Sequence, residues 1–332
     1  MRVTVLYNEP EISRYTAAGE QAAVEGVLVE VAAVTDSLTE LGHQTQRVGL
    51  QPPLSGVRQK LEMLDTDLIF NLFEGFGGSP ESEPAVAAVC ESLRIPFTGC
   101  PSSALTVALK KTNLKKILSK GGIKVPDSQL VNLHTFENFR LGFPCIVKPE
   151  SEDASHGITR ESVVINKAGL RKQVTDMIET FGYPEVMVEE YVEGREFNAA
   201  VLGNRIPSMV EISEIVFELP EDMPKILTYA GKWDKDSLEY KGTTPVCPPV
   251  ITETERAGIK NTVEKSFSIA GCQGYARVDM RMDAAGNIYV LEVNPNPDIS
   301  PDSGAALQAK TAGINYTEFI EKIVKLALEA GI

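Results

Sequence analysis

The order of apolar and polar positions divides the first hundred residues into alternating strands and helices. Short apolar runs predict strands, and apolar residues at every third or fourth position predict helices. Such alternation is typical of a parallel sheet wrapped by helices, in which ligands sit beyond the carboxyl ends of strands. The predicted strands are 2–7, 45–48, 67–72 and 95–98, and the predicted helices are 22–41 and 84–93.

The pattern beyond residue 101 is mixed. Segment 104–119 predicts one helix that ends before Gly121 and Gly122, and the proline-rich segment 220–249 predicts a long loop. With 332 residues, this α/β (α+β) chain is too long for one ordinary core, so two or three domains should share a cleft. The other predicted strands are 145–148, 162–165, 186–190 and 196–202, and the other predicted helices are 167–181, 252–269 and 315–330.

A hairpin at 274–294 carries the most informative side chains. Both halves alternate between polar and apolar residues, so each has one polar face. With a four-residue turn at 284–287, Asp283 pairs with Ile288. By the same count, farther from the turn, Asp279 pairs with Glu292 and Arg277 pairs with Asn294.

Two carboxylates that face each other across a hairpin repel unless a cation lies between them. Oxygen ligands without cysteine or histidine favour Mg²⁺, so Asp279, Glu292 and Asn294 are predicted metal ligands. Arg277 beside them offers a charge-assisted hydrogen bond to a phosphate or a developing oxyanion. The alternative is an amphipathic hairpin whose polar face is solvated.

Composition narrows the function classes. The formal net charge of −14 repels a nucleic-acid backbone. The chain has no signal-peptide pattern and no run near the roughly 18 apolar residues of a membrane span. Its five cysteines include no CxxC pair, which argues against a zinc site or a disulfide framework. We therefore expect a cytoplasmic protein with neither nucleic acid nor membrane as a partner.

No phosphate-binding P-loop motif is present, and Pro80 breaks the GxGxxG pattern after Gly75, so any nucleotide must be held in another way. A different set of motifs occurs along the chain, in this order: Lys111 after Lys110, Val147-Lys148-Pro149, Ser155-His156-Gly157, the acidic run from Glu189 to Glu196, Lys232-Trp233, Arg277-Val278-Asp279 and Leu291-Glu292-Val293-Asn294. With these motifs in this order, the chain resembles the ATP-grasp superfamily, specifically the D-alanine–D-alanine ligase family.

The resemblance implies an ATP-grasp fold in three parts. Residues 1–100 would form an N-terminal α/β domain, 101–188 a central lobe with a lid loop at 149–157, and 189–332 a C-terminal lobe with the metal site. It also implies ATP and one or two Mg²⁺ ions, for which Mn²⁺ can substitute. The partners implied are small-molecule carboxylate and amine substrates, and a second copy of the chain in a homodimer.

The same resemblance assigns residues to the phosphates of ATP. Lys111 and Lys148 would contact them, and Ser155 with the lid-loop N–H groups would cradle their oxygens. The alternative for both lysines is a solvated surface position, favoured more for Lys111 because other lysines crowd it. The apolar run before Lys148 indicates burial, and a buried lysine needs an anionic partner.

Other residues would contact the adenosine. Glu189, Glu190 and Val192 lie on the strand whose backbone would bond the adenine edge, and Glu196 would bind ribose hydroxyls. The alternative for these glutamates is edge-strand charge.

The chemistry implied has two steps. A carboxylate attacks the γ-phosphate to give an acyl phosphate, and an amine then attacks the acyl carbon. Lys232 would approach the γ-phosphate, and Arg277 would stabilise the tetrahedral intermediate. Water must be excluded, which gives the two predicted loops a purpose.

The substrate side departs from the family. A serine-x-glutamate motif is missing after the first strand, where Glu9 or Glu11 would have to substitute. The family's lid glycine and first lid serine are Asp153 and Ala154, and its tyrosine after the loop lysine is Trp233.

These altered groups form the family's substrate-side hydrogen-bond network. Trp233 is then either a wall of the acceptor pocket or a packing residue. Ser303 aligns with a substrate-contacting serine, followed by Gly304 in place of an aliphatic residue.

Three hypotheses remain. The first is an ADP-forming amino-acid or peptide ligase with substrates other than two D-alanines. The second is a D-alanine–D-alanine ligase of cell-wall synthesis. The third is a nucleotide-binding protein without catalysis, which would not require the acidic residues together with Arg277.

Overall fold

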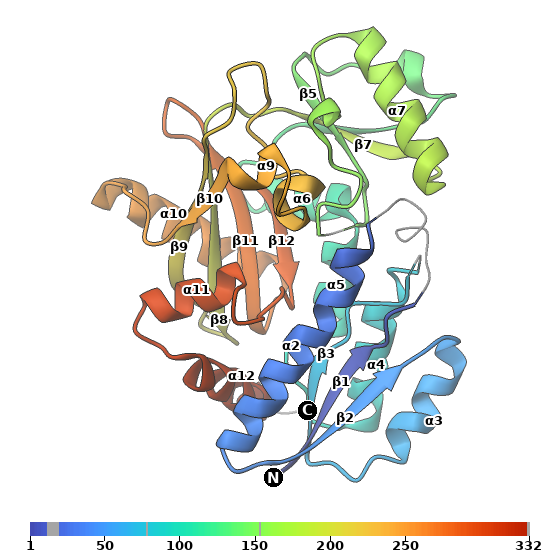
Figure 1. The fold of residues 1–332 in the computed structure, drawn as a ribbon, viewed down its shortest axis with the longest axis vertical. Helices are drawn as coiled ribbons and strands as arrows, with labels where there is room; N and C mark the ends of the chain where they lie inside the picture. The colour runs from blue at the N-terminus through green and yellow to red at the C-terminus, as the bar shows by residue number, and fades with distance from the viewer. Residues whose placement is uncertain (12–19, 78, 153, 331–332) are drawn as a thin grey trace.

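The computed structural model describes residues 1–11, 20–77, 79–152 and 154–330, and three β-sheets organise them (Figure 1). The first sheet is parallel, in the order β2-β1-β3, and confirms the sheet predicted for the first hundred residues. Segment 95–98 adds only a bridge between Phe97 and Ile69. The elements are β1 (Arg2–Asn8), α2 (Gln21–Glu40), β2 (Gln44–Leu50), α3 (Val57–Glu62), β3 (Leu68–Leu72) and α4 (Ser82–Leu93).

The second sheet is antiparallel and has the order β4-β7-β5-β6. Helix α7 (Lys167–Phe181) packs its apolar stripe on this sheet through Leu170, Val174 and Met177. The Asn166 side chain caps its start, and Gly182 ends it with a left-handed φ of 70° that suits glycine. The strands are β4 (Ser128–Val131), β5 (Cys145–Lys148), β6 (Val163–Val164) and β7 (Val186–Glu190).

The third sheet has five antiparallel strands in the order β10-β9-β8-β11-β12. Its strands are β8 (Arg195–Gly203), β9 (Ser208–Phe217), β10 (Thr243–Val246), β11 (Gly274–Met282) and β12 (Ile288–Pro295). The helices that follow or interrupt them are α10 (Glu253–Ala270), α11 (Gly304–Thr311) and α12 (Tyr316–Ala330).

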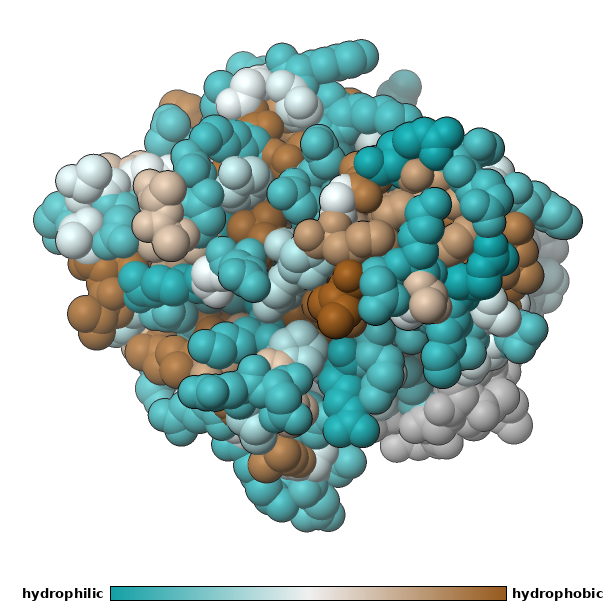
Figure 2. All heavy atoms as spheres, turned by 90° about the horizontal axis from the view of Figure 1, so that it is seen from above, coloured by the Kyte–Doolittle hydropathy of each residue, from teal (hydrophilic) through white to brown (hydrophobic). Residues whose placement is uncertain are grey.

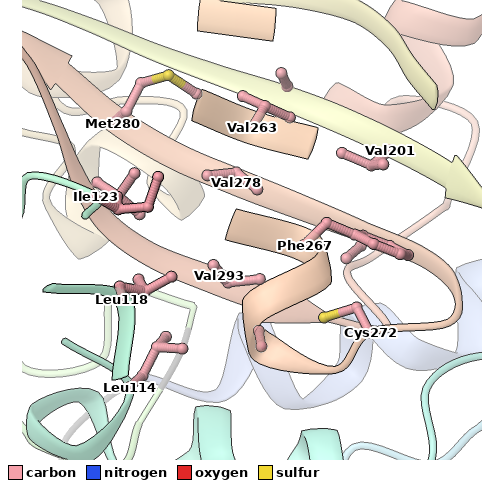
Figure 3. Close-up of a cluster of buried hydrophobic side chains, with 14 of the residues drawn as sticks. Leu114, Leu118, Ile123, Val201, Val263, Phe267, Cys272, Val278, Met280 and Val293 are labelled. Carbon is pink, nitrogen blue, oxygen red and sulfur yellow. The ribbon is translucent and has the colours of Figure 1, made fainter. Parts of the chain in front are cut away.

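A hydrophobic core fixes one face of the β11–β12 hairpin (Figure 3). Val278 and Val293 point into it, where they meet Phe267 of α10 and Leu118 of α6 (Lys111–Lys120). Because strand side chains alternate, the residues directly before and after each valine project from the opposite face. The core therefore determines where Arg277, Asp279, Glu292 and Asn294 point.

A second core joins the first sheet to the third. It contains Val5 of β1, Leu38 of α2, Tyr275 of β11 and Phe319 of α12. Figure 1 shows the long α2 between the first sheet and the two C-terminal helices. The carboxyl ends of the parallel strands are thereby held near the third sheet.

The single helix predicted at 104–119 is wrong. Two helices, α5 (Ser102–Leu109) and α6, meet at Lys110, which has extended backbone angles of φ −102° and ψ 98°. The break frees the Lys111 N–H to donate to the Glu150 carbonyl at 3.2 Å. Apolar spacing continues through both helices, so periodicity alone could not detect the break.

The long loop predicted at 220–249 is also wrong. It contains α8 (Tyr229–Trp233), α9 (Leu238–Lys241) and the edge strand β10. Elements of four or five residues are too short to produce a periodic pattern. Strands β4 and β9 were likewise not predicted.

The surface carries both hydrophilic and hydrophobic residues. Figure 2 shows one face on which hydrophilic residues dominate and hydrophobic residues form separate patches. None of the helices in the described ranges combines the length and apolar character needed to cross a membrane.

Candidate active site

The polar face of the β11–β12 hairpin brings the predicted residues together. Asp279 lies opposite Glu292 and Arg277 opposite Asn294, as predicted. The pairing of Asp283 with Ile288 is wrong, because Ile288 pairs with Met282. A register shift after Asp279 compensates for this difference, so the predicted pairing is correct at the site although it fails at the turn.

These side chains form one hydrogen-bonded group. The Arg277 Nε and a terminal guanidinium nitrogen donate to the two oxygens of Asp279, both at 2.7 Å. The Asn294 amide nitrogen donates to Asp279 Oδ2 at 2.9 Å and to Glu292 Oε1 at 3.2 Å. The polar face is therefore not an ordinary solvated hairpin face.

Their protonation reflects burial and neighbouring charge. Burial raises the pKa of Asp279, although Arg277 opposes this shift. Burial alone would also raise the pKa of Glu292, but Lys111, Lys148 and Arg277 lower it to about 2. Glu292 therefore stays ionised at neutral pH.

Lys111 is buried, which contradicts the solvated alternative for this residue. As the first residue of α6, it extends toward the hairpin, and its Nζ lies 3.5 Å from Glu292 Oε2. The same Nζ donates to the Glu152 carbonyl at 2.5 Å. Lys111 thus links Glu292, a predicted metal ligand, to the lid loop at 149–157.

Lys148 belongs to a buried charged triad. Its Nζ donates to Glu189 Oε1 at 3.0 Å, and Lys115 Nζ lies 2.6 Å from Glu189 Oε2. Lys148 sits on β5 next to β7, which places it beside Glu189. Glu189 is only 2 % exposed, so the edge-strand alternative is wrong for this glutamate.

Lys115 was not predicted. The sequence shows Lys115 only as one of several lysines near Lys111, yet its side chain is buried and faces Glu189. Burial lowers its pKa to about 8, against the opposing effect of Glu189. Lys115 lies four positions after Lys111 on the same helix, so the two side chains project from one face. This spacing could have identified Lys115 as a site residue.

The predicted adenosine residues follow β7 into β8. Glu190 is exposed at the end of β7, and Val192 is buried beyond it. Arg281 was not predicted and binds Glu196 Oε2 at 3.0 and 2.8 Å and the Val192 carbonyl at 2.8 Å. Arg281 therefore fixes the positions of Val192 and Glu196 relative to each other.

One cavity of about 370 Å³ collects these residues. It lies between the carboxyl ends of the first sheet, the lid loop, the end of β7 and the polar face of the hairpin. The predicted residues that line it are Glu9, Lys111, Lys148, Ser155, Glu189, Glu190, Val192, Glu196, Lys232, Arg277, Asp279, Glu292 and Asn294.

The lid loop covers part of this cavity. Ser155 lines it with a left-handed φ of 62°, and Ala154 before it has φ 53°. The Ser151 hydroxyl also lies in the lining, is buried, and makes no hydrogen bond within the described residues. Ser151 is a second candidate phosphate contact that was not predicted. Asp153, noted as a departure from the family, lies outside the described residues.

Lys232 and Trp233 have different surroundings although they are neighbours on α8. Lys232 lines the cavity, and burial, with Arg277 nearby, lowers the pKa of its ammonium group. Trp233 is not among the described residues that line the cavity. Its ring lies next to Tyr229, and its Nε1 donates to the Ala154 carbonyl at 3.2 Å.

The predicted substrate residues are only partly brought together. Glu9 lines the cavity and accepts a hydrogen bond from the Gln51 amide. Ser303 instead caps α11, with its hydroxyl accepting from the Ala306 N–H at 3.2 Å. Neither Ser303 nor Gly304 is among the described lining residues.

The donor set for a metal consists of two carboxylates and one amide. Over the described ranges, no three His, Cys, Asp or Glu side chains form a group suited to a metal ion. The candidate site therefore depends on the Asn294 amide, whose nitrogen now faces both carboxylates. A half-turn of that amide would present its oxygen, giving the hard oxygen donors that Mg²⁺ takes.

Comparison with known proteins gives a consistent result. A family model described as the D-ala D-ala ligase C-terminus matches residues 117–325. The D-alanine–D-alanine ligase of Actinobacillus succinogenes is 29 % identical over 308 residues, which cover 90 % of this chain and 91 % of that protein. The uncharacterized protein y4sG of Sinorhizobium fredii is 30 % identical over 299 residues, covering 89 % and 86 %.

Solved structures share the fold over nearly the whole chain. The ATP complex of the D-alanine–D-alanine ligase from Bacillus anthracis has a TM-score of 0.76 at 21 % identity, covering 99 % of this chain and 97 % of that one. The VanG D-Ala:D-Ser ligase from Enterococcus faecalis has a TM-score of 0.73 at 19 % identity, covering 98 % and 99 %. The predicted ATP-grasp fold is therefore confirmed.

Proposed function

Because the chain belongs to the D-alanine–D-alanine ligase family and is an ADP-forming ligase of the ATP-grasp type, we propose that it joins amino-acid substrates other than two D-alanines. The product would be an amide formed through an acyl phosphate. A contrast between two groups of residues supports this proposal. Lysines and carboxylates suited to Mg·ATP line the cavity, whereas the lid is bonded by Glu20 and Trp233, which are not among the described lining residues.

The first step would use the lysine side of the cavity. A carboxylate oxygen of the first substrate attacks the γ-phosphorus, the bond to the β-phosphate oxygen breaks, and ADP leaves. Lys111 and Lys148 would hold the phosphates, and Lys232 would offset charge on the transferring group. Ser155 and Ser151 would add hydrogen bonds from the lid.

The second step would depend on Arg277. The amine nitrogen attacks the acyl carbon, loses a proton, and phosphate leaves as the amide forms. Arg277 is half-buried in the cavity lining, and although burial has the opposite effect, Asp279 raises the pKa of its guanidinium. A permanently charged donor at this position can stabilise the oxyanion of the tetrahedral intermediate.

Asp279, Glu292 and Asn294 would hold Mg²⁺, with Mn²⁺ as a substitute. The ion would supply charge neutralisation of the triphosphate. Arg277 balances the charge of Asp279 and Lys111 lies 3.5 Å from Glu292, whereas the neutral Asn294 amide only donates hydrogen bonds. The two carboxylates are therefore held next to positive charge.

The adenosine would lie along the end of β7. The backbone from Glu189 to Val192 would bond the adenine edge, and Glu196, held by Arg281, would accept from the ribose hydroxyls. The buried Glu189 side chain would then position Lys148 rather than contact the nucleotide.

The substrate side of the cavity is rich in carboxylates. Glu9, Glu11, Glu74, Glu83 and Asp298 all line it. Burial, with Glu74 and Asp298 close by, also raises the pKa of Glu30 well above its ordinary value. We propose that these carboxylates receive the ammonium groups of the substrates.

The proposed substrate difference can be tested with an ADP-release screen. Purified protein with Mg·ATP would be given pairs of amino acids, amines and dicarboxylates, and products identified by mass spectrometry. The D-alanine pair should be turned over at least about tenfold more slowly than the best pair. Equal or faster turnover of D-alanine would contradict the proposal.

The family relatives keep D-alanine–D-alanine ligation as a second candidate. The specific observation in its favour is the match to the Actinobacillus succinogenes enzyme along 90 % of this chain. The same screen separates the two candidates, because only this one predicts a D-alanine dipeptide as the main product.

Metal removal gives a further prediction. Calorimetric titration with ATP should show binding in the presence of Mg²⁺, and chelation with EDTA should weaken it by about tenfold or more, because triphosphate charge then meets Glu292 and Asp279 without a bridging cation. Unchanged affinity after chelation would rule out the metal assignment.

The division into 1–100, 101–188 and 189–332 remains a proposal, and its second boundary falls within β7 (Val186–Glu190). The homodimer and the cytoplasmic location remain predictions. Size-exclusion chromatography with light scattering would measure the oligomeric state.

A further inference from the structure

Groups from two distant parts of the chain contact the lid loop at residues 154–157. Glu20 Oε2 lies 2.6 Å from His156 Nδ1, and Glu20 Oε1 accepts from the Gly157 N–H at 3.2 Å. The Trp233 Nε1 donates to the Ala154 carbonyl at 3.2 Å. The first sheet's region and the α8 segment therefore both bond to the lid.

The contact made by Glu20 is buried. Glu20 and His156 are 7 % and 8 % exposed. Glu20 directly precedes α2, yet its side chain caps no N–H of that helix and both of its oxygens face the lid. A buried carboxylate committed in this way costs free energy unless its bonds form, so the contact favours one lid position.

The lid backbone needs such support. Ala154 and Ser155 are consecutive non-glycine residues with φ of 53° and 62°. Left-handed backbone at such residues costs about 1 kcal/mol or more each and persists where neighbouring structure over-determines it. The Trp233 bond is made to the carbonyl of Ala154 itself, and the Glu20 bonds are made to His156 and Gly157, which directly follow Ser155.

We propose that Glu20, His156 and Trp233 form a clasp that keeps the lid shut over the cavity. They act as positioning residues, since none of them needs to touch the reacting atoms. This clasp includes the bond between Trp233 and the Ala154 carbonyl, two positions at which the sequence departs from its family.

The consequence for the reaction rests on the proposed function. With the lid open, water reaches the acyl phosphate and attacks the acyl carbon. The bond to the phosphate oxygen breaks, and the products are the original carboxylate, inorganic phosphate and a proton released to solvent. ATP is then consumed without amide formation, so the clasp controls how tightly the two are coupled.

Lid closure can be measured without any substrate, because Trp233 is the only tryptophan in the chain. Acrylamide quenching of its fluorescence would be compared between the wild type, Glu20→Ala and His156→Ala. Loss of a buried charge-assisted bond of about 1.5–3 kcal/mol should raise the open population tenfold or more, and quenching with it. Glu161→Gln, an exposed carboxylate of the same lobe, should quench like the wild type.

A double-mutant cycle distinguishes the clasp from general loss of structure. The double variant should quench no more than Glu20→Ala alone, because Glu20→Ala already removes the His156 contact together with the bond to Gly157. All three variants should keep the far-ultraviolet circular dichroism of the wild type. Wild-type quenching in both single variants, or purely additive effects, would overturn the proposal.

A second measurement uses the reaction itself. The ratio of phosphate released to amide formed should rise several-fold in Glu20→Ala and in Trp233→Phe, which keeps an aromatic ring but lacks the Nε1–H. A merely structural role would lower both products equally and leave the ratio unchanged. If the wild type forms no amide with any substrate pair, the proposed function fails, while the quenching result still decides the clasp.

Discussion

Glu292→Gln should lower ATP-dependent amide formation by about a thousandfold, while the protein stays folded. Glu292 is a carboxylate whose pKa is held near 2 by Lys111, Lys148 and Arg277, so it is ionised at any working pH. Glutamine removes this charge where the proposed metal and triphosphate meet. Steady-state ADP release and amide formation would measure the loss.

The control is Asp283→Asn, at the turn of the same hairpin and away from the cavity lining. Its side chain accepts bonds from Ala285 and Asn287, which asparagine can also do. Its activity should stay within about twofold of the wild type. Normal activity in Glu292→Gln would refute the metal assignment.

Glu189→Gln should lower the free energy of unfolding by about 3–5 kcal/mol. Glu189 is buried between Lys115 and Lys148, and glutamine would remove the carboxylate that contacts both ammonium groups. Urea unfolding would measure the change. Glu190→Gln, one residue along β7 and exposed, should change stability by no more than about 0.5 kcal/mol. Equal stability of the two variants would show that the triad does not form.

The pH dependence of this penalty has a definite sign. Burial lowers the pKa of Lys115 to about 8, from an ordinary 10.5, so the unfolded chain holds this proton more tightly than the folded one. The contribution of Lys115 to the unfolding free energy therefore rises between about pH 8 and 10.5. Near pH 10 Lys115 is mostly neutral in the fold, and the penalty of Glu189→Gln should be smaller than at pH 7.

Local alternation was enough to predict the parallel sheet, the hairpin and the opposition of Asp279 to Glu292. The break at Lys110 could not be predicted, because the bond that accompanies it joins Lys111 to Glu150, 39 positions away in the chain. The motif order placed Lys148 and Arg277 in the cavity. It could not show that Lys115 is buried, since only the fold brings Glu189 to it.

Ser303 and Trp233 show the limit of carrying roles over by alignment. The resemblance assigned Ser303 to the substrate and left Trp233 as a pocket wall or a packing residue, but Ser303 caps a helix and Trp233 bonds the lid. Glu20 was not predicted at all. Its role depends on a contact with His156 across 136 positions, for which the sequence contains no local signal.

The core that joins the first sheet to α12 also determines when this protein can fold. Val5 and Phe70 leave the ribosome early, but their partner Phe319 is synthesised long afterwards. Until then an apolar face of the first sheet stays open to other chains and to chaperones. Translation must therefore proceed past α12 before the N-terminal sheet gains its full stability, and premature truncation should yield insoluble fragments.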